Sequence, residues 1–439
     1  MGIVQCMDGK KYKTFGDLAM GYLNSLLNCF SQSNEVVDVF DRYDTELSIK
    51  GTERKLRARR ANCTKVYQVL ESRGLPDLKK FLAVEENKRQ LVSFLGSFVE
   101  KVVCMSERVP NGKTLYMAGA FDNPDIVKKF TTEEVNLCEE LGSTQEEADT
   151  RIILHLINID SSFKRSGTRG RVIVQSSDTD VLVLCCHFLQ KLTNTDELWI
   201  QKGHCVRDGK KFVPVHDIYK ALPSHVPKVL PVLHALSGCD TVSSMYGIGK
   251  KSVFKLMCLD VEICLGLEDV EDGMIFLNAC RRFVARLYDA KSKYKDSHGD
   301  LNKLRYKLAT AKEPSLARLP PSEMAFREHV ERARLQSIIW LNADVAVAPS
   351  ISPTDHGWSI EEGTLCPVPF KGNMTEDILN ELICQCKGKK KCHDNCVCRS
   401  RQFPCTELCV CGGLDMCLNE HTHNLIVGKQ MEGNEELVD

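Results

Sequence analysis

The chain has 439 residues, 43% of them hydrophobic, and a formal net charge of −1. This length predicts two or three domains with a sizeable core, and the near-neutral charge limits polyanion binding to local patches. The sequence shows no basic segment followed by a long apolar one at its start and no run of about eighteen apolar residues, so we expect no signal peptide and no membrane partner. We expect a nuclear or cytoplasmic protein, with the nucleus favoured.

Strand-like and helix-like segments alternate from the start of the chain to about residue 290. This alternation predicts an α/β domain with a largely parallel sheet. The apolar run at 36–40 predicts a buried strand, and Asp41 stands at its carboxyl end. Residues 48–65 predict a basic helix, which suits a phosphate backbone or, alternatively, forms a solvated face. Its cations are Lys50, Arg54, Lys55, Arg57, Arg59, Arg60 and Lys65.

Further helices and strands follow in the same domain. The patterns Thr131-x-x-Glu134 and Ser143-x-x-Glu146 have the spacing of capping boxes, which begin helices. The other expected elements are a helical region at 77–105, strands at 171–175 and 199–201, and a helix at 227–236 that leads into a turn at Asp240.

The remainder of the chain changes character twice. Beyond residue 260 the pattern is helical to about residue 345, so we expect the α/β domain to span residues 1–290 and a helical extension to span 291–345. Residues 346–375 carry several prolines and little periodicity, which predicts a linker.

Acidic residues mark the points where the predicted strands and helices meet. In open α/β sheets ligands gather at the carboxyl ends of strands, and carboxylates that converge there need divalent cations. Two magnesium or manganese ions about 4 Å apart can clamp the attacking and leaving oxygens of a phosphodiester. Each acid also has a structural explanation, as a helix-dipole partner, an N-cap or a turn residue. The acids are Asp41, Glu147, Asp149, Asp178, Asp180 and Asp240.

Four motifs in chain order resemble the flap-endonuclease-type branch of the PIN-like nuclease superfamily. They are Val37–Asp41 with the basic segment after it, Glu146–Asp149, Ser177–Asp180, and Leu236–Asp240 followed by Tyr246–Lys251. The resemblance covers residues 36–257 and implies a metal-dependent, structure-selective nuclease that acts on DNA. It implies that two magnesium or manganese ions are held by the six acids named above.

The same resemblance implies where nucleic acid binds. The basic segment from Lys50 to Arg60 would grip phosphates, and the amides of Gly247 and Gly249 would approach a DNA phosphate with help from a monovalent cation. Lys250 and Lys251 complete this second contact. A different class of function stays open, because a non-catalytic nucleic-acid- or chromatin-binding protein can retain the same fold and the same acids.

One part of the family pattern is missing from this chain. The family's first strand supplies an Asp, and here only Asp8 and Asp17 are near, neither of them at the end of an apolar strand. We therefore expect that the domain is truncated at its start and that an Asp-containing strand is encoded upstream. The whole layout also resembles animal proteins that join a nuclease-like domain to a Cys-rich cluster, with shared segments at 40–43, 146–150 and 234–240.

Nine cysteines near the end of the chain form one unit repeated three times. They are Cys384, Cys386, Cys392, Cys396, Cys398, Cys405, Cys409, Cys411 and Cys417. This spacing predicts tetrahedral zinc sites, and nine thiolates suffice for three structural zinc ions if three of them bridge two metals. The alternative is a disulfide module, which an odd number of cysteines disfavours.

The cysteine unit resembles CXC domains of the tesmin type and the pre-SET clusters of histone methyltransferases. A pre-SET cluster precedes a methyltransferase domain, for which the acidic tail at 421–439 is too short. CXC domains usually bind nucleic acid or chromatin, so the cluster at 376–420 implies a tether. The expected phosphate contacts are Lys387, Lys389, Lys390, Lys391, Arg399 and Arg401.

Overall fold

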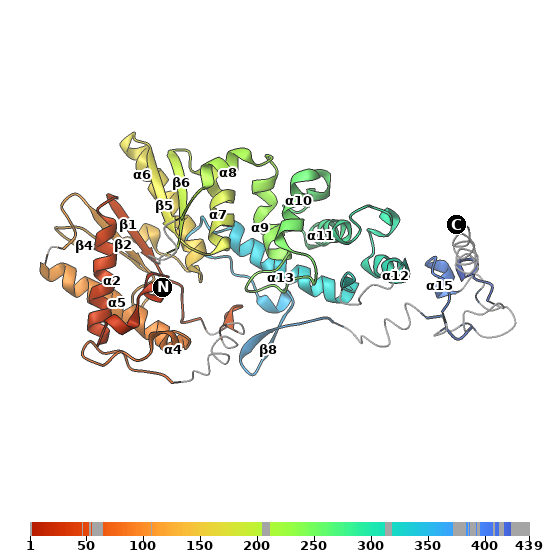
Figure 1. The fold of residues 1–439 in the computed structure, drawn as a ribbon, viewed down its shortest axis with the longest axis horizontal. Coiled ribbons are helices and arrows are strands. Elements are labelled where there is room, and N and C mark those ends of the chain that lie inside the picture. The colour runs from red at the N-terminus through yellow and green to blue at the C-terminus, as the bar shows by residue number, and fades with distance from the viewer. Residues whose placement is uncertain are drawn as a thin grey trace, which may run out of the picture. The chain divides into compact units, whose positions relative to one another are not determined.

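The computed structural model describes residues 2–45, 47–51, 54, 65–106, 108–203, 211–311 and 318–371, and short stretches of the Cys-rich region between 383 and 422. The chain divides into two compact units, Met1–Pro369 and Phe370–Asp439, whose elements are labelled in Figure 1. Within the described part, no helix combines the length and the apolar character needed to cross a bilayer. Several expected phosphate-binding residues lie outside the described residues, namely Lys55, Arg57, Arg59, Arg60, Lys387, Lys389, Lys390 and Lys391.

The larger unit begins with a four-stranded sheet whose order is β1-β2-β3-β4. Strands β1 (Glu35–Val39) and β2 (Thr114–Ala118) are parallel, and β3 (Val127–Phe130) and β4 (Val135–Leu137) extend the sheet antiparallel. The described residues of this half form the helices α1 (Gly2–Cys6), α2 (Phe15–Cys29), α4 (Leu78–Phe81) and α5 (Glu85–Ser106). Their apolar side chains share one core with β1 and β2.

A second, three-stranded sheet has the order β5-β6-β7. Strands β5 (Gly170–Gln175) and β6 (Thr195–Lys202) are parallel, and β7 (Lys211–Pro214) is antiparallel to β6. The helices of this region are α6 (Ala148–Ser166), α7 (Thr179–Phe188), α8 (Val215–Ala221) and α9 (Val226–Leu236). Because β5 and α7 follow one another directly, the carboxyl end of β5 delivers its acids to the start of a helix.

The expected α/β architecture is confirmed at this level, with parallel strand pairs flanked by helices, but the strands form two sheets where we expected one. Short connections favour antiparallel neighbours, which explains β3 and β4. The first predicted capping box is wrong, because Glu134 N donates to Thr131 Oγ1 in the turn between these two strands. The second is displaced: Ser143 Oγ accepts from Gln145 N, and α6 begins only at Ala148.

Helices complete the larger unit, namely α10 (Lys250–Leu259), α11 (Gly273–Tyr288), α12 (Leu301–Ala311) and α13 (Glu323–Leu341). Helix α13 shares a core with α7, α9 and α11, so part of the predicted helical extension packs into the α/β domain. Residues expected as linker contain an antiparallel hairpin of β8 (Trp358–Glu361) and β9 (Thr364–Pro367). Its Trp358 and Leu365 form a small apolar cluster with Leu335 of α13, which explains why this stretch is ordered.

Candidate metal centres

The acid site lies where β1 and β5 end and where α6 and α7 begin. Asp41, two residues after β1, accepts a hydrogen bond from Ala148 N, the first amide of α6, at 2.9 Å. Asp178, three residues after β5, caps α7 by accepting from Asp180 N at 2.9 Å. These two caps fix the helix starts that carry Asp149 and Asp180.

Three carboxylates of this site come close enough to hold one cation. Ligand oxygens of Asp149, Asp178 and Asp180 all lie within 4.8 Å of one another. Asp178 is exposed and the other two are largely withdrawn from solvent, so the group opens to the surface on one side. Oxygen ligands in such an arrangement suit magnesium or manganese.

The electrostatics of the site favour a bound cation. Burial, reinforced by the charge of Glu147, raises the pKa of Asp149 well above its usual range. Burial also raises the pKa of Glu147, which Lys50 opposes and Glu146 assists. Burial disfavours the ionised forms of both carboxyl groups because it removes water from them. A bound cation would offset this cost, because opposite charge favours the ionised carboxylate.

Two basic side chains of the segment after β1 face the acids. Lys50 Nζ lies 3.1 Å from Glu147 Oε2, and the charges of Glu147, Asp149 and Asp41 raise the pKa of Lys50 even though burial opposes this. Arg54 bridges Glu85 at 2.7 Å and Glu146 at 3.3 Å. The protein therefore supplies part of the positive charge that the acid site demands.

A histidine of α9 holds one member of the acid group. His234 Nε2 lies 2.8 Å from Asp180 Oδ1, and both side chains are about nine-tenths buried. Burial acts to raise the pKa of Asp180, but the hydrogen bond and charge of His234 outweigh it and the pKa is lowered. The His234 ring also packs beside Trp340 of α13, with ring centroids 5.7 Å apart.

The remaining predicted site residues lie apart from the three carboxylates. Asp240 is exposed on the turn after α9 and does not join the group of Asp149, Asp178 and Asp180. Gly247 has a φ of 78°, a left-handed conformation that favours glycine, and exposed Gly249 precedes α10. Lys251 is exposed, as expected for a phosphate contact.

Lys250 was expected to contact a DNA phosphate, but in this structure it contacts backbone carbonyl oxygens. Its ammonium donates to the carbonyl oxygens of His234 and Gly238, at the end of α9. Burial lowers the pKa of Lys250 to about 8. This side chain ties the start of α10 to the end of α9 in this structure, and its contact with nucleic acid stays a prediction.

The nine cysteines of the smaller unit converge. Three overlapping sets of four could each hold a metal ion, and they contain every predicted cysteine except Cys417. Cys384 belongs to all three sets, and Cys392 and Cys405 belong to two each. Cys417 is buried, and its thiol faces Cys392 and Cys405.

The sulfur separations match metal sites better than disulfides. Cys384 Sγ lies 3.5 Å from Cys392 Sγ and 3.7 Å from Cys411 Sγ, and Cys398 and Cys409 are also 3.7 Å apart. Two thiolates on one tetrahedral zinc lie about 3.8 Å apart, because each Zn–S bond is about 2.3 Å long. A disulfide bond is only about 2.05 Å long. No disulfide bond forms among the described cysteines, so the cluster is compatible with zinc.

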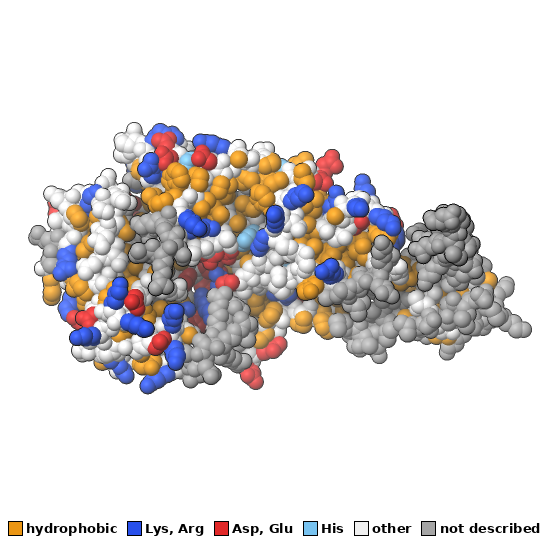
Figure 2. Space-filling view, in the orientation of Figure 1, with side chains coloured by type: hydrophobic (Ala, Val, Ile, Leu, Met, Phe, Trp, Pro, Cys, Tyr) orange, Lys and Arg blue, Asp and Glu red, His pale blue; other side chains and the backbone are white. Residues whose placement is uncertain are grey.

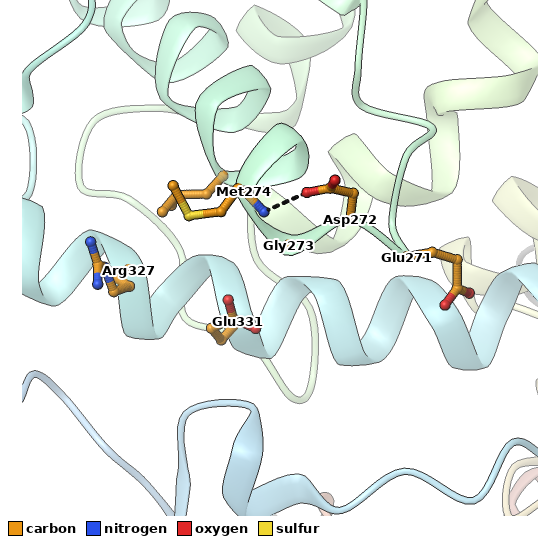
Figure 3. A pocket seen from close by; sticks show the side chains of 7 residues that line it. Glu271, Asp272, Gly273, Met274, Arg327 and Glu331 are labelled. Carbon is orange, nitrogen blue, oxygen red and sulfur yellow. Dashed lines mark hydrogen bonds between the residues drawn. The ribbon is translucent and has the colours of Figure 1, made fainter.

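A separate hollow lies between the start of α11 and α13 and brings no comparable chemistry together. Figure 3 shows Arg327 and Glu331 of α13 facing Gly273 and Met274, while Asp272 caps α11 at Met274 N. Glu331 is already engaged by His356 at 3.2 Å.

Comparison with known proteins finds no matching family model, no matching curated protein and no matching solved structure. The PIN-like family and the CXC family therefore stay predictions from the motifs. What the structure adds is the mixed α/β fold and the two candidate metal centres.

Two parts of the acid site escaped sequence reasoning. Lys50 was expected to face a phosphate, whereas it pairs with Glu147 inside the site. His234 begins the segment 234–240 that carries the second resemblance. Its separation from Asp180 in the sequence gave no indication that the two side chains are in contact. The available signal was that His234 is a histidine within the apolar helical segment that leads into the predicted turn at Asp240.

Proposed function

We propose that this chain is a divalent-cation-dependent phosphodiesterase that cuts nucleic acid, with DNA as its preferred substrate. The observation that supports this most is the meeting of Asp149, Asp178 and Asp180 beside Asp41 and Glu147, where β1 and β5 end. Carboxylates that share a partly buried site need cations, and this donor set is the one that magnesium and manganese take.

The residues of the site would have different roles in such a reaction. Asp149, Asp178 and Asp180 would hold magnesium or manganese, which when bound supplies Lewis acidity at a phosphoryl oxygen. Asp41 and Asp178 keep the first turns of α6 and α7 in register, and His234 orients Asp180. Lys50 and Arg54 would turn from the acids to the entering phosphate once the cation has neutralised those acids.

The cysteine cluster would serve as a zinc-held module that tethers the enzyme to nucleic acid. Arg399 and Arg401 follow Cys398 in the described part of this unit. A rigid metal core would hold such cations at fixed positions for phosphate contact. Three zinc ions with bridging thiolates form part of this proposal.

A cleavage assay tests the proposal directly. End-labelled DNA flap, hairpin and single-stranded substrates, and their RNA equivalents, are incubated with the purified chain and manganese or magnesium. Cleavage that requires the added metal and disappears with EDTA supports the proposal. No cleavage of any substrate at saturating metal contradicts it.

A second candidate is a non-catalytic nucleic-acid-binding protein that keeps the fold. The ion pair of Lys50 with Glu147 favours it, because a built-in cation can stabilise the acids without metal. If the chain binds DNA but takes up no manganese, even as the variant Lys50→Met, this second function replaces the first.

A further inference from the structure

An exposed basic surface lies away from the acid site, on the first loop of the chain and the region around α4. We infer that this surface binds the phosphate backbone of a nucleic acid. It is defined by six exposed cations: Lys10, Lys11, Lys13, Arg73, Lys79 and Lys80. The inference rests on the proposed function for its ligand class, and it assigns a contact surface that none of the motifs contains.

Short-range contacts bring these cations together from three separate segments. The backbone at Gly9 is packed against Leu78, so that a Cβ on Gly9 would lie 2.9 Å from the Leu78 side chain. Leu75 N donates to Lys13 O at 2.8 Å, and Phe15 N donates to Arg73 O at 3.1 Å. The lysine pairs at 10–11 and 79–80 thereby flank one contact, and Figure 2 shows Lys and Arg side chains gathered in the region where α4 lies.

The cations of this surface have no ionic partners among the described residues. Elsewhere the described basic residues are often paired, as Arg42 is with Asp44 and Asp125. No ion pair involves the six cations of the basic surface within the described part of the chain. The Arg73 guanidinium donates to Gln68 O at 3.1 Å, whereas among the described residues no hydrogen bond or ion pair engages the ammonium groups of the five lysines. The surface therefore keeps positive charge that a polyanion can neutralise.

The acids nearby are turned toward the backbone instead. Asp8 accepts from Lys10 N at 3.2 Å, Asp17 accepts from Thr14 N at 2.9 Å, and Asp77 accepts from Lys80 N at 2.9 Å. These carboxylates accept from backbone amides at helix starts and turns, and although the charge of Lys13 helps to lower the pKa of Asp17, no ion pair joins them to the lysine ammonium groups within the described residues. The lysine head groups remain available to an external partner.

An aromatic side chain beside the cations favours nucleic acid over a membrane surface. The half-buried Tyr67 ring lies under Lys65 Nζ at 5.0 Å and under Arg73 at 5.8 Å, and it is supported by Phe81 at 5.8 Å. Cations grouped around a firmly held aromatic ring are the arrangement that single-stranded nucleic acids use for phosphate contact and base stacking.

Charge reversal tests the inference with a matched control. The quadruple variant Lys10→Glu, Lys11→Glu, Lys79→Glu, Lys80→Glu is compared with Lys211→Glu, Lys228→Glu, Lys291→Glu, Lys295→Glu, which changes the net charge equally at exposed positions elsewhere. Binding to a fluorescein-labelled single-stranded DNA 30-mer and to its duplex is measured by anisotropy across a salt series. All eight side chains are exposed, so circular dichroism should show both variants folded.

The surface variant should bind at least about tenfold more weakly, and its salt slope should fall by about 3, because each lost phosphate contact removes about 0.7 to 0.9. The control should keep the wild-type slope. Equal slopes in the two variants, or no binding by the wild type, would overturn the inference. Loss of binding to phosphatidylserine vesicles with unchanged DNA binding would assign the surface to a membrane instead.

The same proteins separate this inference from the proposed catalysis. Hydrolysis of bis(p-nitrophenyl) phosphate with manganese requires the acid site but no extended nucleic acid. Both variants should hydrolyse it as the wild type does. If the wild type fails to hydrolyse it while DNA binding still depends on the basic surface, catalysis is refuted and the surface stands.

Discussion

Single carboxylates of the acid site carry both structure and chemistry. Asp178 caps α7, so Asp178→Ala also costs about 1 kcal/mol of stability, whereas Asp178→Asn keeps a capping oxygen. We expect Asp178→Asn and Asp180→Ala each to lower metal-dependent cleavage by about 100-fold or more and to leave DNA binding nearly intact. Rates come from end-labelled DNA, and full activity in both variants would point to another site or a contaminant.

His234 acts on the site through Asp180. Replacing a residue that orients a metal ligand typically costs about 10- to 100-fold in metal affinity. His234→Leu should weaken manganese binding by that amount, whereas His234→Gln, whose amide nitrogen can reach Asp180, should recover most of it. Electron paramagnetic resonance of free manganese measures both, and equal affinity in all three proteins would leave His234 with a packing role only.

Asp149 should make stability depend on pH in the absence of metal. Burial and Glu147 raise its pKa in the folded state, so the folded protein holds the proton more tightly than the unfolded chain does. The contribution of Asp149 to the free energy of unfolding is therefore fully present below its ordinary pKa of about 4 and is lost as pH rises through the folded-state value. Urea titrations in EDTA at about pH 5 and about pH 8 measure this effect. Between the two pH values the free energy of unfolding should fall more in the wild type than in Asp149→Asn. A parallel loss in both proteins would contradict this explanation.

The turn after α9 combines local structure that was predictable from the sequence with long-range contacts that were not. The helix at 227–236 and the glycine turn were predictable from local pattern. The support that α13 gives this turn was not, because Thr241 donates to Gln336 and His329 lies 2.8 Å from Leu236 O, partners about ninety residues distant in the chain. Local spacing carries no information about such pairs.

The cysteine unit was predictable in more detail, since its spacing alone indicated which cysteines would converge. The structure adds that these cysteines are unequal: Cys384 belongs to three sets of four that could hold a metal and Cys386 to one. We expect about three zinc ions in the purified chain, a larger loss of zinc from Cys384→Ser than from Cys386→Ser, and unfolding of the unit on chelation. Elemental analysis measures this, and a wild-type value near two would exclude three zinc ions with bridging thiolates.

For the whole molecule, the sequence predicted the α/β class and the order of the acidic segments but not the division of the α/β domain into two sheets. Parallel or antiparallel pairing depends on which strands meet, and short strands such as β4 and β7 carry little periodicity of their own. The sequence predicted that these acids meet at the carboxyl ends of strands in one sheet, whereas the structure brings Asp178 and Asp180 from the end of β5 and Asp149 from the start of α6. The sequence did not predict that Asp240 would be absent from this group of three carboxylates, because a turn gives no fixed direction to its side chain.

Manganese binding by the intact protein tests the central claim, that the acid site is a divalent-cation site. Electron paramagnetic resonance counts bound manganese in the zinc-loaded wild type and in the double variant Asp149→Asn, Asp178→Asn, with the zinc content checked in parallel. We expect manganese to bind to the wild type and not to the double variant, with the zinc content unchanged in both. Equal manganese binding by the two proteins, or none by the wild type, would contradict it.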